Sequence, residues 1–369
     1  MTEHSARGRL ITVLGDPAAA RNLDDGQWSG LIATARSANL LGALAQRLKE
    51  AGMSAGQHAD RHLDGAWQLS ARQRQSVLWE VHQLQAALGE LKIPILLLKG
   101  AAYVISEHVV AQGRLFGDID ILVPHAALGD VESRLMLNGW VSARSSAYDQ
   151  HYYRKWMHEL PPMTHIRRGT VLDVHHTILP LTARNAPDPN QIIARSVPVN
   201  IPGLSMLRVP CPEDLAIHSI VHLVHEGDLH NGLRDLRDID CMLRSFEGAP
   251  GFWSRLVEGA SGNDLAWPVC FGLHLVRDFF GTPVPDSVLA QLLPSTQTSR
   301  MVKWLKAIYA RALHPGSDTE LDTATILAKW LVYVRAHSLR MPMPQLLRHL
   351  AIKAWKGWRA GFGEPDQPK

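Results

Sequence analysis

The sequence predicts an α+β fold in which a small mixed sheet lies between two helical regions. Apolar residues recur at three- and four-residue spacing from residue 25 to about residue 91, which is typical of helices. Short apolar or alternating runs follow, which indicate strands. After Pro210 the helical spacing returns and continues to the end. We therefore expect a helical region at 1–91, a core at 92–205 and a second helical region at 206–369.

The core elements follow from local patterns in chain order. A continuous apolar run at 93–98 predicts a buried strand, and a short helix is expected at 101–110. Alternating Asp and Ile predict a second strand at 118–123, closed by a proline. A helix at 126–137 ends at an Asn-Gly pair, and an antiparallel hairpin is expected at 163–176, with its turn at Arg168-Gly169.

Composition excludes several classes of protein. The 369 residues carry 38 Lys and Arg against 35 Asp and Glu, so the net charge of +3 gives no sign of an obligatory long nucleic acid partner. Three widely spaced cysteines, Cys211, Cys241 and Cys270, exclude a disulfide scaffold and favour a reducing cytoplasm. The most apolar run is far shorter than the roughly 20 residues of a membrane span. A basic amphipathic stretch at 344–362 is expected to be a docked terminal helix, with peripheral membrane contact as the lesser alternative.

The strongest chemical signal is a set of three aspartates. Asp118 and Asp120 lie two residues apart in a predicted strand, so the pleat places both carboxylates on one face. The same alternation places Asp173 and His175 on one face of a later strand. If the strands are neighbours, three carboxylates converge and repel one another, and Mg²⁺ suits such an oxygen cluster. Repulsion alone predicts that Asp120→Asn leaves the metal-free protein as stable as before or slightly more stable.

A second signal lies at Lys99-Gly100, where a strand passes into a helix. Gly100 removes the side chain at the point where a phosphate would approach, and Lys99 offers a positive charge. Glycine after a strand is also common in ordinary turns. Lys99-Gly100 could therefore either bind phosphate or simply form a turn.

The order of these motifs resembles the nucleotidyltransferase fold of the DNA polymerase β superfamily. The likeness is nearest to its bacterial branch of uncharacterised nucleotidyltransferases, through LLKG at 97–100, RLFGDIDILV at 114–123 and LDVH at 172–175. It covers about residues 90–180, and the histidine-rich stretch at 218–240 resembles the helical part of that branch more loosely.

The resemblance implies a fold, an activity and a set of site residues. It implies a nucleotidyltransferase-type sheet and transfer of a nucleoside monophosphate from an NTP such as ATP to a hydroxyl acceptor. Asp118 and Asp120 would hold two Mg²⁺ ions, and Asp173 would complete one of the two sites. The nucleotide would lie against residues of the two glycine-containing motifs, namely Lys99, Gly100, Ala101 and Gly117. Ala101 stands where the superfamily usually has serine.

Two alternative functions remain from the sequence. A protein that kept the fold but lost turnover would bind nucleotides or other proteins, and Ala101 favours that view. A metal-dependent hydrolase would use His218, His222 and His225, which share one helix face, although this spacing is more typical of a packed helix. Arg234 or Arg237 is a lesser candidate for binding substrate phosphate. The sequence does not indicate the oligomeric state.

Overall fold

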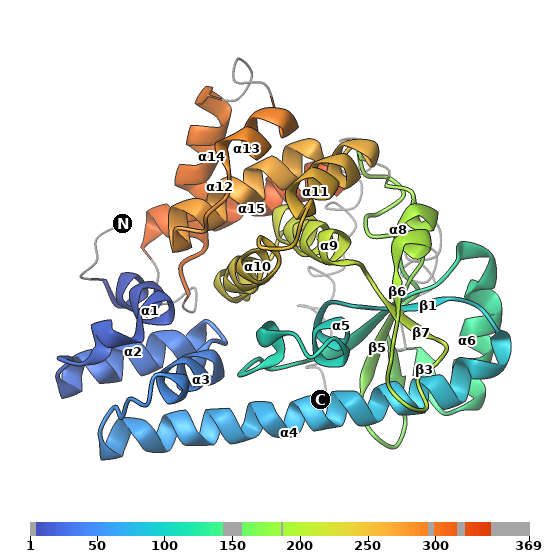
Figure 1. The fold of residues 1–369 in the computed structure, drawn as a ribbon, viewed down its shortest axis with the longest axis horizontal. Coiled ribbons are helices and arrows are strands. Elements are labelled where there is room, and N and C mark those ends of the chain that lie inside the picture. Colours follow the sequence, from blue (N-terminus) through green and yellow to red (C-terminus); the bar gives the residue numbers. More distant parts are fainter. Residues whose placement is uncertain (1–4, 143–156, 186, 294–298, 316–321, 341–369) are drawn as a thin grey trace, which may run out of the picture.

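The computed structural model describes residues 5–142, 157–185, 187–293, 299–315 and 322–340. One mixed seven-stranded sheet has the order β3-β4-β5-β2-β1-β7-β6, and helices surround it (Figure 1). The predicted α+β class is confirmed. The stretch at 344–362 lies outside the described residues. The expected unit boundaries near residues 91 and 205 remain predictions.

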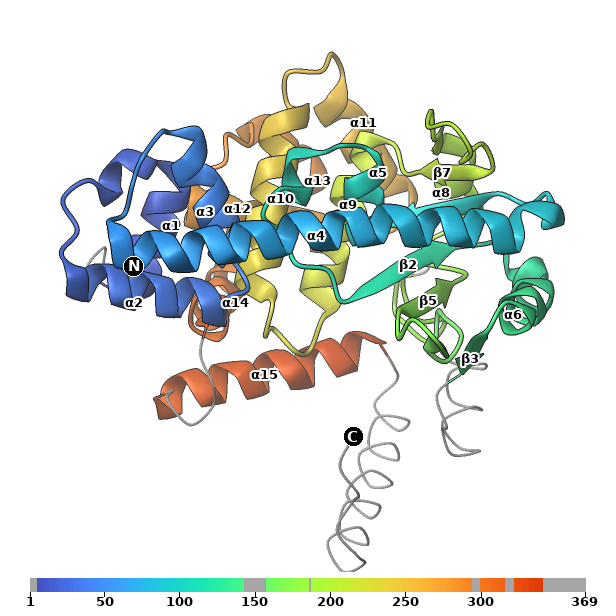
Figure 2. The same ribbon diagram turned by 90° about the horizontal axis from the view of Figure 1, so that it is seen from below.

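The N-terminal helices are α1 (Ala6–Gly15), α2 (Asp25–Ser37), α3 (Leu41–Glu50) and α4 (Gln57–Leu88). The first three helices form a group at one end of the molecule, and α4 runs along most of its length (Figure 2). Helix α4 packs on α3 near its start and on α5 and α6 in the core. One long helix thus ties the N-terminal group to the sheet.

The core contains the predicted elements, three more strands and one more helix, at 189–195. The predicted strands are β1 (Ile95–Leu98) and β2 (Asp118–Leu122), and the hairpin is β4 (Met163–His165) and β5 (Val171–His175). The core helices are α5 (Lys99–Ile105), α6 (Leu128–Leu137) and α8 (Pro189–Arg195). The strands that the sequence did not predict are β3 (Trp140–Ser142), β6 (Val197–Pro198) and β7 (Leu207–Val209), which extend the two sides of the sheet.

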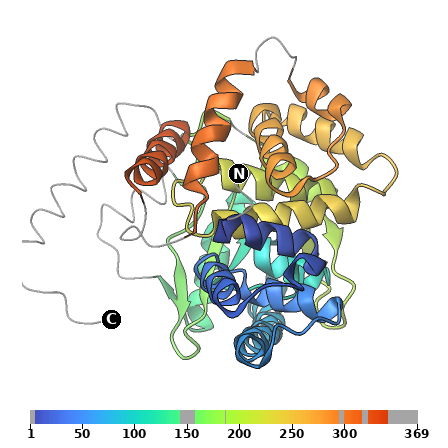
Figure 3. The ribbon, with the colours of Figure 1, turned by 90° about the vertical axis from the view of Figure 1, so that its left-hand side faces the viewer.

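The C-terminal region is helical, as predicted. Its helices are α9 (Pro212–His225), α10 (Gly232–Phe246), α11 (Phe252–Gly262), α12 (Ala266–Phe280), α13 (Asp286–Leu292), α14 (Ser299–Ala312) and α15 (Thr323–Arg340). Figure 3, which looks nearly along the axis of α4, shows α4 and α14 on opposite sides of the molecule. The buried apolar side chains form one contiguous cluster from Leu10 to Val332, so the helices and the sheet share a core. No helix in the described ranges has the length and apolar character needed to cross a membrane.

Candidate functional site

The predicted aspartates meet because β2 and β5 are parallel neighbours (Figure 2). Asp120 pairs in register with Asp173, and Asp118 precedes Asp120 by two residues on the same face of β2. Side chains of paired residues in neighbouring strands point to the same face, and the alternate residues Ile119 and Leu172 are buried in the core. The arrangement of three carboxylates that the alternation predicted is therefore present.

Asp120 is not a bare carboxylate, because two basic side chains contact it. The Lys99 ammonium lies 2.7 Å from its Oδ1, and His175 Nε2 lies 3.0 Å from the same oxygen. Burial by itself would raise the pKa of Asp120, but Lys99 and His175 outweigh burial and hold it well below its usual range. The expectation that Asp120→Asn leaves the metal-free protein as stable as before is therefore corrected, because the substitution would break a buried ion pair.

Asp173 has the opposite environment. Burial, followed by the charges of Asp120, Glu159 and Asp118, raises the pKa of Asp173 to about 7. Its Oδ1 is buried and has no hydrogen-bond partner among the described residues. The nearby Arg168 does not pair with Asp173, because its guanidinium contacts Glu80. A carboxylate oxygen left without a partner beside two other acids fits a site that binds a divalent cation.

Neutralising Asp173 is expected to stabilise the metal-free protein above neutral pH. Its raised pKa means that the folded state retains a proton that the unfolded state has lost, so this residue makes stability fall between about pH 4 and about pH 7. In EDTA, Asp173→Asn should lack the decrease in stability that Asp173 causes over this pH range. Its melting temperature at about pH 8 should therefore be higher than that of wild type. Thermal melts of wild type, Asp173→Asn and the exposed control Asp130→Asn across this range measure the effect. Equal pH dependence in wild type and Asp173→Asn would contradict it.

Lys99 and Gly100 lie where β1 passes into α5. Lys99 adopts a left-handed backbone conformation with φ of 42°, and no side chain caps the start of α5. A Cβ on Gly100 would lie 2.7 Å from Cδ1 of Phe116, so glycine here allows the Phe116 ring to pack closely. Both Lys99 and Gly100 line a cleft, whereas Ala101 is buried and does not.

This cleft, which we call the interregion cleft, lies between the core and helices α9 and α10 and has a volume of about 540 Å³. Its walls include Lys99, Gly100, Phe116, Gly117, Asp118, Asp120, His222 and Arg234. Arg114 closes one side, with its Nε 2.7 Å from Oδ2 of buried Asp238 on α10. Of the two arginines that the sequence offered for phosphate binding, Arg234 lines the cleft and Arg237 does not.

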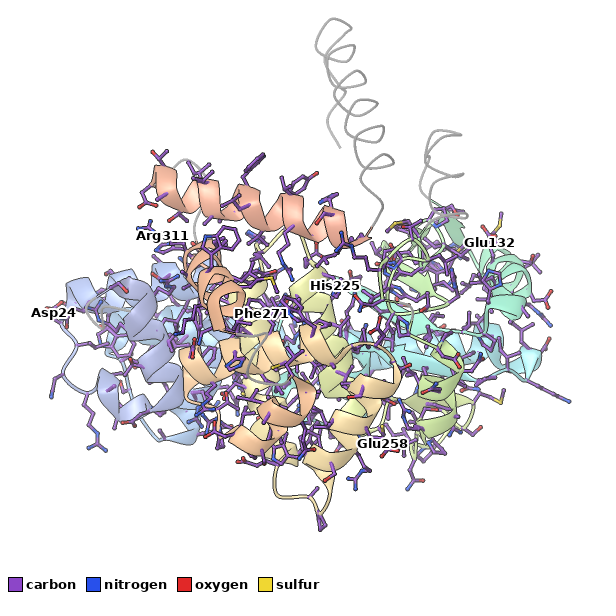
Figure 4. The ribbon with its side chains drawn as sticks, turned by 90° about the horizontal axis from the view of Figure 1, so that it is seen from above. Asp24, Glu132, His225, Glu258, Phe271 and Arg311 are labelled. Atoms are coloured by element: carbon purple, nitrogen blue, oxygen red, sulfur yellow. The ribbon has the colours of Figure 1, made fainter. Side chains whose placement is uncertain are left out.

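The three histidines of α9 point to different surroundings. His218 and His225 are buried, and Figure 4 places His225 among the C-terminal helices. Burial lowers the pKa of His218 to about 3 and that of His225 to about 4, so both imidazoles are neutral. His222 lines the interregion cleft and lies 3.7 Å from Glu226. The described part of the chain does not bring these three rings together as metal ligands.

The histidine and acid group that does converge was missed in the sequence. Ligand atoms of His158, Glu159 and His175 lie within 4.8 Å of one another. His175 Nδ1 is 3.4 Å from Oε2 of Glu159, while its Nε2 contacts Asp120, so the imidazole connects the two acids. Glu159 reaches His175 through a single β-bridge, which has no periodic signal in the sequence.

Two comparisons with known proteins bear on this site. No match was found among curated proteins. A family model described as uncharacterised nucleotidyltransferase matches residues 24–281, which contain the three aspartates, the interregion cleft and helices α2 to α12. Because the match covers more than half of the sequence, the chain belongs to this uncharacterised nucleotidyltransferase family.

Proposed function

We propose that this protein transfers a nucleoside monophosphate from an NTP to a hydroxyl group of a small molecule or a protein, and that Mg²⁺ is required. The observation that carries the proposal is the register of β2 and β5, which sets Asp120 beside Asp173 with Asp118 on the same face. In the reaction, the acceptor oxygen forms a bond to the α-phosphorus. The bond from that phosphorus to the bridging oxygen breaks, and pyrophosphate leaves.

The carboxylates fit two divalent cations. Asp118 and Asp120 would contact both ions, and Asp173 would contact one, which also gives its orphaned Oδ1 a partner. When bound, the ions supply positive charge to the phosphates and to the acceptor oxygen. Without them, Lys99 is the cation nearest to Asp120. Its ammonium has three donors, so it can keep Asp120 and also contact a phosphate oxygen.

Asp173 is the proposed proton acceptor. In the metal-free protein, burial and neighbouring acids raise its pKa to about 7. A bound cation would lower that pKa, so Asp173 would be ionised and able to accept a proton when the ions are present. The proton of the acceptor hydroxyl would pass to Asp173 as the new bond forms. The triphosphate would occupy the interregion cleft, where Lys99, Gly100, Gly117 and Arg234 lie.

A nucleotide-binding protein without turnover is the second candidate. Two observations favour it, the buried ion pair between Lys99 and Asp120 and the alanine at position 101. The two candidates differ in whether pyrophosphate is released.

The experiment uses labelled nucleotides in cell extract. With Mg²⁺ and each of the four NTPs carrying an α-phosphate label, we expect one NTP to transfer its label to an extract component with release of pyrophosphate. A γ-phosphate label should not be transferred, which separates nucleotidyl transfer from phosphorylation. EDTA should abolish the reaction. NTP binding without label transfer would favour the inactive alternative.

A further inference from the structure

A second cavity, which we call the α4 groove, meets the interregion cleft at the start of β2. It has a volume of about 700 Å³ and lies between α4 and the turn that joins β4 to β5. Phe116, Gly117 and Asp118 line both cavities, so the two spaces adjoin at Asp118. The amide of Phe116 donates to Oε1 of Gln73, 2.8 Å away, which fixes this shared wall to α4.

The α4 groove contains a positioned aromatic surface. Trp79 on α4 is 51% exposed, so part of its ring is accessible to a ligand. The Arg168 guanidinium lies 5.3 Å from the Trp79 ring and 5.4 Å from the ring of buried Trp140. Arg168 is itself fixed by Glu80, whose Oε1 is 2.7 Å from the Arg168 Nε. Such an ordered, exposed indole suits the flat face of a ligand.

A buried acceptor lies beside this surface. Glu80 lines the α4 groove but is only 5% exposed. Its Oε1 accepts from Arg168 and, at 2.7 Å, from the hydroxyl of Thr170, whereas its Oε2 has no hydrogen-bond partner among the described residues. Leaving a buried carboxylate oxygen unpaired is costly, so a ligand that brings an N–H donor to it gains free energy.

The interregion cleft has a different character. Its glycine-containing segments, Lys99 and Arg234 suit phosphate oxygens once divalent cations offset its acidic side chains, and its one Tyr side chain, Tyr103, is 3% exposed. The α4 wall of the α4 groove instead carries Trp79, Gln73 and Gln75. The interregion cleft therefore suits the triphosphate of an NTP, and the α4 groove suits its base.

We propose that the α4 groove binds the base of the NTP, with Trp79 stacking on it and Glu80 Oε2 accepting from an exocyclic amino group. The triphosphate then lies in the interregion cleft and the α-phosphate beside Asp118, at the junction. The inference rests on the proposed function. It predicts that NTPs whose bases carry an amino group, such as ATP, bind better than UTP, whose base presents carbonyl oxygens on either side of its only N–H.

Equilibrium binding of ATP, UTP and inorganic tripolyphosphate with Mg²⁺ tests the inference without an acceptor. Trp79→Ala should weaken ATP binding about tenfold or more, the usual loss for one stacked base, and should leave tripolyphosphate binding unchanged. Trp304→Ala is the matched control, because Trp304 on α14 is 59% exposed and lies outside both cavities. It should bind both ligands as wild type does.

Glu80→Gln tests the polar half of the inference. It keeps the shape of the side chain and replaces one oxygen by an amide donor, so the preference for ATP over UTP should fall or reverse. Unchanged tripolyphosphate binding reports that the variant is folded.

The outcomes separate the inference from the function on which it rests. If wild type binds ATP but Trp79→Ala binds it equally well, the base lies elsewhere and nucleotidyl transfer still stands. If Trp79→Ala loses ATP and tripolyphosphate binding alike, the residue supports the fold and the inference is overturned. If wild type binds neither ligand, both the inference and the proposed function fail.

Discussion

Asp118→Asn should lower nucleotidyl transfer by about a thousandfold, or about 4 kcal/mol of transition-state stabilisation. The substitution removes one negative charge from the carboxylates proposed to hold both cations. Burial, and next to it Asp120, already raises the pKa of Asp118, so loss of the charge relieves repulsion and the fold should persist. Transfer of α-phosphate label in extract measures the change.

An exposed aspartate on α4 provides the control for this result. Asp64→Asn removes the same charge from a residue that lies outside both cavities, and its activity should match that of wild type. Thermal melts should show both variants folded. Wild-type activity in Asp118→Asn would show that the carboxylate takes no part in the reaction.

Arg114→Met should destabilise the protein by roughly 3–5 kcal/mol. The Arg114 side chain is 10% exposed and pairs with Asp238, which is 4% exposed, across the junction of core and C-terminal helices. Burial already raises the pKa of Asp238, and the charge of Arg114 is the largest effect that lowers it. Removing the arginine leaves an uncompensated buried acid, because the remaining contact of Asp238 with Arg237 is longer, at 3.8 Å. Urea unfolding measures the loss.

An exposed ion pair provides the matched control. Arg134 contacts Glu90 with side chains that are 38% and 74% exposed, so Arg134→Met should cost about 1 kcal/mol or less. Equal losses of stability in the two variants would show that burial of the Arg114–Asp238 pair does not increase its contribution to the free energy of unfolding. The comparison thus isolates burial from charge.

The sequence predicted the site-bearing strands because their pattern is local. Asp118 and Asp120 alternate with isoleucines that fill the core, and Asp173 alternates with Leu172 and Val174 in the same way. Such alternation fixes which face each side chain takes before any pairing is known. The strands β3, β6 and β7 have only two or three residues each, too few for a period to emerge, whereas the equally short β4 was predicted from its turn at Arg168-Gly169.

Contacts that depend on pairing could not be predicted from local patterns. Leu98 lies opposite Asp120 in the antiparallel pair of β1 and β2, and this register brings the next residue, Lys99, to the Asp120 carboxylate. Trp79 is likewise one apolar residue among many on a long helix until the β4–β5 turn is placed beside it. The ion pair of Lys99 with Asp120 and the position of Trp79 in a groove therefore depend on contacts between segments that are distant in the sequence.

Mn²⁺ binding followed by electron paramagnetic resonance tests the central claim most directly, since it needs neither the acceptor nor turnover. Titrations of wild type, Asp118→Asn, Asp173→Asn and Asp64→Asn in the presence of ATP would be compared. We predict that the first two variants bind Mn²⁺ much more weakly than wild type and Asp64→Asn do. Equal binding by all four proteins would contradict the claim that these carboxylates converge to hold divalent ions.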